Sequence, residues 1–158
     1  MMTASLLQEE IRQTRPFVSL EEEAFLNLQR TANTLLQNIT RSLKDYDLTP
    51  TQYNVLRILR GSHPETLTCG DIGDRMVTPD PDVTRLLDRL EKRELVRRAR
   101  YTVDRRVVRA GITELGLAIL EQLDSPVPEW LRKMLGHLTE DELGTMIRLL
   151  EKVRGKVR

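Results

Sequence analysis

The chain has few of the residues from which metal centres, disulfide frameworks and catalytic triads are built. Its 158 residues include one cysteine, Cys69, and two histidines, His63 and His137. A single thiol excludes an internal disulfide, and so few Cys and His ligands disfavour a zinc site. The sequence also lacks a glycine-rich phosphate loop and a nucleophile, base and acid set. We therefore expect no enzyme, no catalytic residue, no metal and no cofactor.

Aromatic residues, net charge and long apolar runs are scarce as well. Aromatics make up 4% of the chain, which disfavours a protein that stacks single-stranded bases. The formal net charge is +1, from 25 Lys and Arg against 24 Asp and Glu, so a basic surface for nucleic acid must be local. No apolar run approaches the roughly 18 residues of a membrane span, and the start MMTASLLQEEIRQ lacks the pattern of a signal peptide. The expected protein is soluble and cytoplasmic, with no membrane partner.

Capping pairs mark most of the helix starts. Three Ser or Thr residues are followed three positions later by Glu or Gln, as in a capping box, and a fourth is followed by Asp: Ser19–Glu22, Thr49–Gln52, Thr139–Glu142 and Thr68–Asp71. Apolar residues at three- and four-residue spacing follow each pair. The pattern predicts helices that end near Asp45, Gly61 and Met76, and a last helix that reaches Val153. Two more helices are expected within 113–138.

A further helix is predicted to end near Arg93, with a start that the sequence leaves open between Thr78–Pro79 and Asp80–Pro81. One face carries Val83, Leu86, Leu87 and Leu90. The other face presents Asp82, Thr84, Arg85 and Arg89. Such a face can be a solvated surface with charge pairs along the helix. It can also read base edges in a major groove, where arginine pairs with guanine by two hydrogen bonds.

The segment Leu95–Ile112 predicts a β-hairpin that turns near 102–104. It holds one acid, Asp104, against the arginines Arg97, Arg98, Arg100, Arg105, Arg106 and Arg109. Alone, this hairpin could be a charged edge that resists aggregation. A polar helix followed at once by a basic hairpin is typical of a winged helix-turn-helix that contacts phosphates and the minor groove through its wing.

The predicted fold is mainly α with a small β-wing, in a single domain over 1–158. The winged helix-turn-helix core occupies about 48–112, and N- and C-terminal dimerisation helices occupy about 5–45 and 113–156. One small core cannot cover the apolar stripes of the terminal helices, so we expect a twofold homodimer. Two reading helices would then contact half-sites about 10 bp apart on a pseudo-palindromic operator of double-stranded DNA.

Several segments in this order resemble the multiple-antibiotic-resistance regulator (MarR) family: DLTPTQYNVL at 47–56, DVTRLLDRLE at 82–91, LV at 95–96, DRR at 104–106 and ITELG at 112–116. The resemblance covers nearly the whole chain and implies a dimeric winged helix that regulates transcription. By position, Arg106 is similar to the wing-tip arginine of the minor groove, and Asp104 to the acid that steadies it. The entry to the reading helix, Pro79-Asp80-Pro81-Asp82, is stiffer and more acidic than in many members. Glu94 stands where the family usually has glycine, which suits a left-handed helix cap better.

The predicted DNA-binding residues fall into two sets. The reading helix contributes Asp82, Thr84, Arg85 and Arg89, and the wing contributes Arg98, Arg100, Asp104, Arg105 and Arg106. The resemblance also implies a small aromatic or anionic ligand that relieves repression from a crevice between the lobes. Candidate lining residues are Phe17, Tyr53, Arg57, His63 and Trp130.

Two alternatives remain at this point. A winged helix can serve protein contacts without binding DNA. Cys69 begins a helix, whose dipole can lower a thiol pKa, so a redox-responsive regulator is the second alternative.

Overall fold

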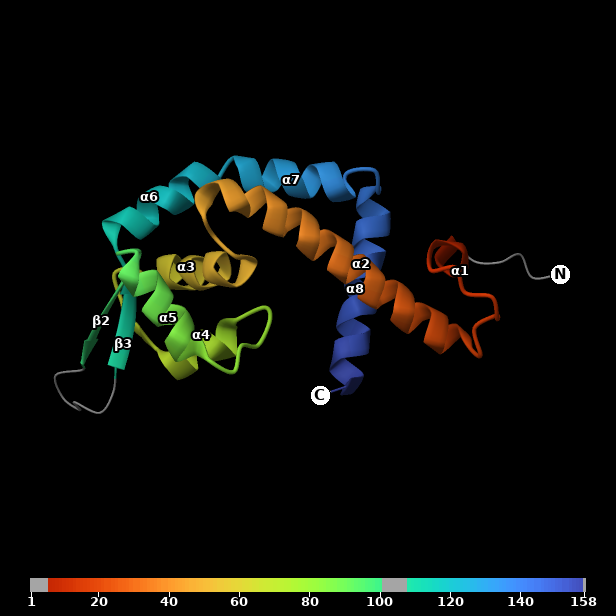
Figure 1. Ribbon diagram of the computed structural model, residues 1–158, viewed down its shortest axis with the longest axis horizontal. Coiled ribbons are helices and arrows are strands. Elements are labelled where there is room, and N and C mark those ends of the chain that lie inside the picture. Colours follow the sequence, from red (N-terminus) through yellow and green to blue (C-terminus); the bar gives the residue numbers. More distant parts are fainter. Residues whose placement is uncertain (1–5, 101–107, 158) are drawn as a thin grey trace.

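A computed structural model describes residues 6–100 and 108–157 of the chain. Within these residues, 48–100 and 108–112 form a winged-helix lobe that lies beside an arch made by the terminal helices (Figure 1). The first half contains α1 (Leu6–Glu10), α2 (Leu20–Leu43), the 3-10 turn η1 (Lys44–Tyr46), α3 (Pro50–Ser62), β1 (Leu67–Thr68) and α4 (Cys69–Arg75). The second half contains α5 (Val83–Lys92), β2 (Val96–Arg100), β3 (Val108–Ile112), α6 (Glu114–Leu123), α7 (Pro126–Leu135) and α8 (Glu140–Val157).

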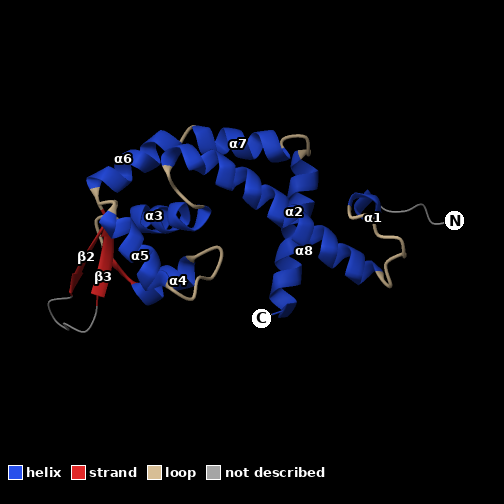
Figure 2. Ribbon diagram, in the orientation of Figure 1, coloured by secondary structure: helices blue, strands red, loops and turns tan. Residues whose placement is uncertain are grey.

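The predicted mainly helical fold with a small sheet is confirmed, and the strands are confined to one end of the molecule (Figure 2). The sheet is antiparallel in the order β1-β3-β2, and β2 pairs with β3 from Val96 opposite Ile112 to Arg100 opposite Val108. The predicted hairpin is therefore present, although its turn at 102–104 lies outside the described residues. Strand β1 was not expected, because two residues are too few to show an alternating pattern.

The four predicted capping pairs are formed, with one variation. Thr49 and Thr68 each accept a hydrogen bond from the third helical N–H. The side chains of Gln52 and Asp71 in turn accept the backbone N–H of Thr49 and Thr68, which completes both boxes. Ser19 accepts from Glu22 at 3.2 Å, but the Glu22 carboxylate accepts from the N–H of Val18 instead. These bonds satisfy N–H groups that the first turn of a helix leaves unpaired.

The two expected starts of α5 are both wrong. The helix begins after Asp82, whose carboxylate accepts the N–H of Arg85 at 2.9 Å. The Asp80 carboxylate accepts the N–H of Asp82 at 2.8 Å, which forms a local turn in place of a helix cap. The residues 78–81 therefore form a connection, and α5 is shorter than the sequence pattern indicated.

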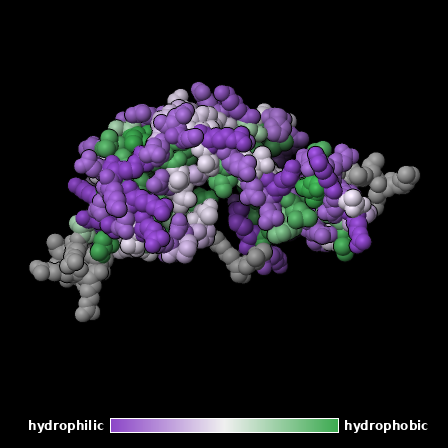
Figure 3. All heavy atoms as spheres, viewed as in Figure 1, coloured by the Kyte–Doolittle hydropathy of each residue, from purple (hydrophilic) through white to green (hydrophobic). Residues whose placement is uncertain are grey.

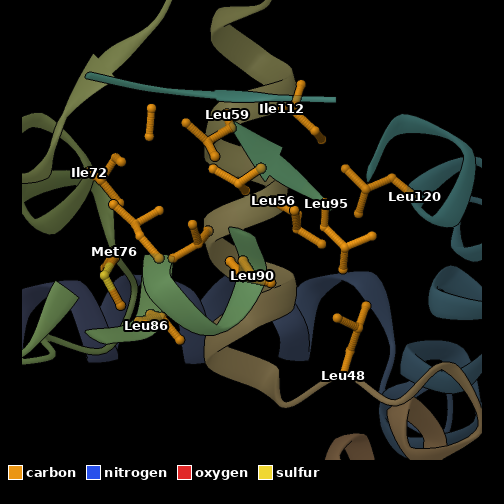
Figure 4. Packing of buried hydrophobic residues seen from close by; sticks show 14 of the residues in the cluster. Leu48, Leu56, Leu59, Ile72, Met76, Leu86, Leu90, Leu95, Ile112 and Leu120 are labelled. Carbon is orange, nitrogen blue, oxygen red and sulfur yellow. The ribbon is translucent and has the colours of Figure 1, made fainter. Parts of the chain in front are cut away.

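The core lies under the sheet and between α3, α4, α5 and α6. Leucine side chains from α3 and α5 converge there with Ile72 of α4 and Ile112 of β3 (Figure 4). Leu56, Leu59 and Leu90 are fully buried. Because the apolar residues of α5 pack in this core, the polar face of the helix is turned outward.

The terminal helices leave large apolar side chains exposed. Phe25 and Leu36 on α2 and Val153 on α8 each expose more than half of their surface. Hydrophobic residues are visible at the end of the molecule where α1, α2 and α8 lie (Figure 3). Among the described helices, none is both long and apolar enough to cross a membrane.

Candidate nucleic-acid interface

Helix α5 offers two polar ridges beside its buried face. Positions four and seven residues apart lie on one line of a helix. Thr84, Asp88 and Glu91 form one such line, called here the acidic ridge. The neighbouring line, called the basic ridge, contains Arg85, Arg89 and Lys92, all of them exposed. A groove-reading helix needs this division between an anchored face and a free one.

The start of the basic ridge is organised by Asp82. Besides capping the helix, its carboxylate lies 3.3 Å from Nε of Arg85, and the Arg85 side chain remains 72% exposed. An exposed pair of this kind contributes little to stability. A carboxylate at this position also complements the dipole of the helix. The arginine stays accessible to a partner.

The predicted wing residue Arg98 lies against the acidic ridge. Its Nε and Nη2 donate to Oε2 of Glu91 at 2.8 and 2.6 Å, and Nη2 lies 2.6 Å from Oδ1 of Asp88. Hydrogen bonds to Glu91 raise the pKa of the Arg98 guanidinium above its ordinary value, and burial opposes this rise. Sequence reasoning missed both acids as partners. The available signal was an Asp and a Glu one helical turn apart, followed by an arginine seven residues later.

The rest of the predicted wing is described only in part. Arg100 is the last residue of β2, where its backbone pairs with Val108. Asp104, Arg105 and Arg106 lie outside the described residues. Arg109 on β3 donates to the carbonyl and hydroxyl of Thr66, which ties the wing to the segment before β1.

The far end of α5 adopts the cap that glycine usually supplies. Glu94 has a φ of 57°, in the left-handed region. Its N–H donates to the Glu91 carbonyl at 2.9 Å, and the Leu95 N–H donates to the Leu90 carbonyl at 3.0 Å, which together form a Schellman motif. The next residue back, Arg93, donates to the carbonyls of Tyr46 and Asp47. This contact joins the reading helix to the turn that follows α2.

A crevice of about 460 Å³ separates the winged-helix lobe from α2 and α7. Its walls are Leu36, Ile39, Thr40, Pro50, Thr51, Tyr53, Asn54, Arg57, Val77, Thr78, Val127 and Leu131. Two of the five candidate ligand residues, Tyr53 and Arg57, line it, and the Arg57 guanidinium carbon lies 5.7 Å from the centre of the Tyr53 ring.

The structure does not bring the other three candidates to this crevice. Trp130 packs edge-on against Tyr46, with ring centres 6.3 Å apart. His63 is the exposed C-cap of α3, and Phe17 lies in the segment between α1 and α2. From sequence spacing, Tyr53 and Arg57 could be predicted to lie side by side, because they are one turn apart on α3. Spacing carries no such information for the other three residues.

An apolar groove of about 710 Å³ runs between α2 and α8. Its apolar lining includes Leu28, Met146, Leu149, Leu150 and Val153. A patch of this kind, rimmed by polar residues, is typical of a protein interface.

Cys69 opens the short helix α4 and is partly exposed, with Sγ 4.0 Å from Oγ1 of Thr84. The thiol therefore lies beside the acidic ridge of α5.

Comparison with known proteins shows a shared family. A model of the MarR family matches residues 48–108. The HTH-type transcriptional regulator MhqR of Bacillus subtilis (strain 168) is 28% identical over 129 residues, which span 82% of this chain and 88% of that protein. A crystal structure of a MarR transcription factor from Planctomyces limnophilus is 43% identical with a TM-score of 0.68, over 86% of this chain and 98% of that one. A mutant MarR from E. coli, solved in complex with operator DNA, is 26% identical with a TM-score of 0.73, over 95% of this chain and 99% of that one.

Proposed function

The chain belongs to the MarR family of transcription regulators, and from this premise we propose that it is a dimeric repressor that binds a pseudo-palindromic DNA operator. The observation that carries the proposal is the basic ridge of α5, which is exposed on a helix whose other face is locked into the core. The relative from E. coli was solved with operator DNA, which supports the same use of this fold.

Within this proposal, α5 reads bases and the wing contacts the backbone. Arg85 is long, is exposed and lies beside Asp82 in an exposed pair, so it can reach a guanine edge. Thr84 and Arg89 flank it and are exposed. At the wing, Arg100, Arg105 and Arg106 are assigned to phosphates and the minor groove, with Asp104 steadying Arg106.

The homodimer is assigned to the exposed apolar surface of the terminal helices. The groove between α2 and α8, together with Phe25 and Leu36, would be covered by a second copy. Sedimentation at micromolar concentration tests this assignment. A stable monomer would contradict it, and a charged substitution, Leu149→Glu, should shift the equilibrium towards monomer.

Operator selection with the purified protein, followed by affinity measurements on the selected duplex, tests the DNA proposal. Arg85→Ala should cost about 1–3 kcal/mol and relax the preference at one base position. Arg106→Ala should weaken binding and reduce any preference for a narrow, A·T-rich minor groove. The matched control is Arg132→Ala, an exposed arginine on α7, which should bind like wild type. If Arg85→Ala and Arg106→Ala also bind like wild type, the assigned reading surface is wrong.

Salt dependence separates DNA binding from a winged helix used for protein contacts. A protein that neutralises several phosphates loses affinity with a log–log slope of about −0.9 per contact. A lack of binding to every selected duplex would favour the protein-contact role. Operator affinity that changes on peroxide treatment, and does not change in Cys69→Ala, would favour the redox role.

We further propose that a small aromatic anion binds the crevice between the lobes and relieves repression. Arg57 supplies a cation next to the Tyr53 ring, and the remaining walls are mainly apolar. An occupant would fix the spacing of the winged-helix lobe relative to α2 and α7, so it can disfavour the DNA-bound arrangement.

Benzoate, with neutral benzamide as its control, is the probe for this ligand response. Benzoate should weaken operator binding by wild type more than benzamide does, and Arg57→Gln should remove the difference. Equal effects of the two compounds on wild type would refute the anionic ligand.

The proposal needs no catalytic activity, metal or cofactor, and the relatives are named as transcriptional regulators. A protein that reads an operator works where the chromosome lies, so we assign it to the cytoplasm.

A further inference from the structure

The contact between Arg98 and the acidic ridge of α5 is unusually complete. The two oxygens of Glu91 are both engaged by this one residue: Oε1 accepts the backbone N–H of Arg98 at 3.0 Å, and Oε2 accepts Nε and Nη2. Asp88, one turn earlier, lies 2.6 Å from the same Nη2. A planar guanidinium that spans two carboxylates is held in both position and orientation.

Burial separates Arg98 from the arginine beside it. The Arg98 side chain is 22% exposed, whereas Arg97, one position earlier on β2, is exposed. Successive side chains on a strand point to opposite faces, so the two arginines belong to different surfaces. A side chain that is mostly covered and already paired with two acids is poorly placed to neutralise a phosphate.

The acidic ridge needs a partner if α5 is to approach DNA. The negative charges of Asp88 and Glu91 repel phosphates, and the two residues lie next to the basic ridge on the same helix. Arg98 neutralises this flank from the wing side. Its contacts also span the turn between α5 and β2, so they join the first strand of the wing directly to α5.

We propose that Arg98 is a positioning residue that fixes the root of the wing on the reading helix through Glu91 and Asp88, and that it is not a phosphate contact. The inference rests on the proposed DNA-binding function. It replaces the direct wing contact expected for Arg98 from the sequence with an indirect role in setting the geometry of two DNA-binding elements. Phosphates fix the register of a protein on DNA, so a misplaced wing lowers operator affinity and selectivity.

Glu91→Gln separates the two roles by the sign of its effect. If electrostatic attraction alone matters, removal of a negative charge next to DNA strengthens binding. If Glu91 holds Arg98 in place, the same substitution weakens operator binding. We expect a loss of about tenfold, the equivalent of one charge-assisted hydrogen bond.

The experiment measures operator and random-duplex affinities over a salt series for wild type, Arg98→Ala, Arg98→Lys, Glu91→Gln and the Arg98→Ala/Glu91→Gln double variant. Active fractions are fixed by stoichiometric titration, so partial misfolding does not alter the ratio of the two affinities. Arg97→Ala removes the same charge from the neighbouring position and calibrates the effect of charge alone.

The proposal expects Arg98→Ala and Glu91→Gln to reduce the operator-to-random ratio by similar factors, with a double variant no worse than either one. Their salt slopes should match wild type. Arg98→Lys should fail to restore the ratio, because an ammonium keeps the charge but cannot reproduce the fork. The ratio of operator affinity to random-duplex affinity should fall further in Arg98→Ala than in Arg97→Ala.

The proposal is overturned if Glu91→Gln binds the operator as tightly as wild type or more tightly. It is also overturned if Arg98→Ala reduces the slope by about 0.9, the value for one phosphate contact, or if Arg98→Lys restores full binding. If Arg98→Ala does not fold, Glu91→Gln and Arg98→Lys decide the question by the same criteria. Absence of binding by wild type to any selected duplex would refute the proposed function itself, which is a distinct result.

Discussion

Glu94→Gly should make the protein more stable. Glu94 is the left-handed residue of the cap that ends α5, with a φ of 57°. Its own N–H and that of Leu95 close the last turn onto Glu91 and Leu90, and its carbonyl accepts the Thr113 hydroxyl at 2.6 Å. Glycine can make each of these backbone contacts without a Cβ.

The expected gain follows from two opposing terms. A residue with a Cβ costs about 1–2 kcal/mol in the left-handed conformation. Glycine loses more chain entropy on folding, and this loss offsets roughly 0.5–1 kcal/mol of the strain that the substitution removes. The net increase in the free energy of unfolding should be about 0.5–1 kcal/mol, which raises the melting temperature by about 1–4 °C in a protein of this size.

Urea denaturation at one fixed protein concentration measures this change, since a dimer unfolds with concentration-dependent stability. The slope of free energy against urea should stay constant, so the midpoint alone moves. Glu94→Ala is the matched control: it removes the carboxylate but keeps the Cβ and its strain. Equal stability of the Gly and Ala variants would refute the argument, because the gain would then not come from the backbone.

Other substitutions and pH test the remaining structure. Gly116→Ala should lower the unfolding free energy by about 1–3 kcal/mol, because its Cβ would lie 2.4 Å from the Leu95 carbonyl oxygen; a normal melting temperature would contradict this. Gly61→Ala, where the added Cβ meets nothing within 4 Å, should instead stabilise α3 by about 0.5–1 kcal/mol in the same assay. Leu87→Ala should cost about 2–5 kcal/mol in urea denaturation, because Leu87 is fully buried. Hydrogen bonds from Thr68 hold the pKa of Asp71 below its ordinary value of 3.8, so the stabilisation is complete above that pH and is lost as pH falls through the lower folded value. Wild type should therefore exceed Asp71→Asn in stability at neutral pH and lose this advantage in acid, and a difference that persists unchanged to pH 2 would contradict the cap.

The helix starts show what short-range pattern can predict and where it fails. Thr49 and Thr68 were predicted as caps because each bond joins residues three positions apart. The start of α5 was predicted wrongly, because two cap-plus-proline signatures lie within four residues of each other. The competing Asp80 turn and Asp82 cap are both local, so residue types alone do not choose between them.

The sequence predicted which elements make up the candidate site more completely than it predicted the contacts between them. The exposed face of α5 and the two strands of the wing follow from periodicity. The Arg98 contact with Asp88 and Glu91 joins β2 to α5, so it depends on how two elements lie relative to each other and not on the pattern of either one. The crevice forms between two parts of the fold, so its lining residues come from several elements. Tyr53 and Arg57, one turn apart on the same helix, were predicted correctly as lining residues, whereas Trp130 packs against Tyr46.

By itself the sequence determined the helices, the caps at Ser19, Thr49 and Thr68, the apolar faces and the separation of a mixed-charge helix from a basic hairpin. These features depend on hydrogen bonds and side-chain spacing within about four residues, or on alternation along one strand. Only the tertiary structure decided the β1–β3 pairing, the joining of Arg93 to a turn 46 positions away and the pairing of Arg98 with the reading helix. The reason is physical: such contacts form between elements whose relative placement is set by packing of the whole core, and that packing is not encoded in any one segment.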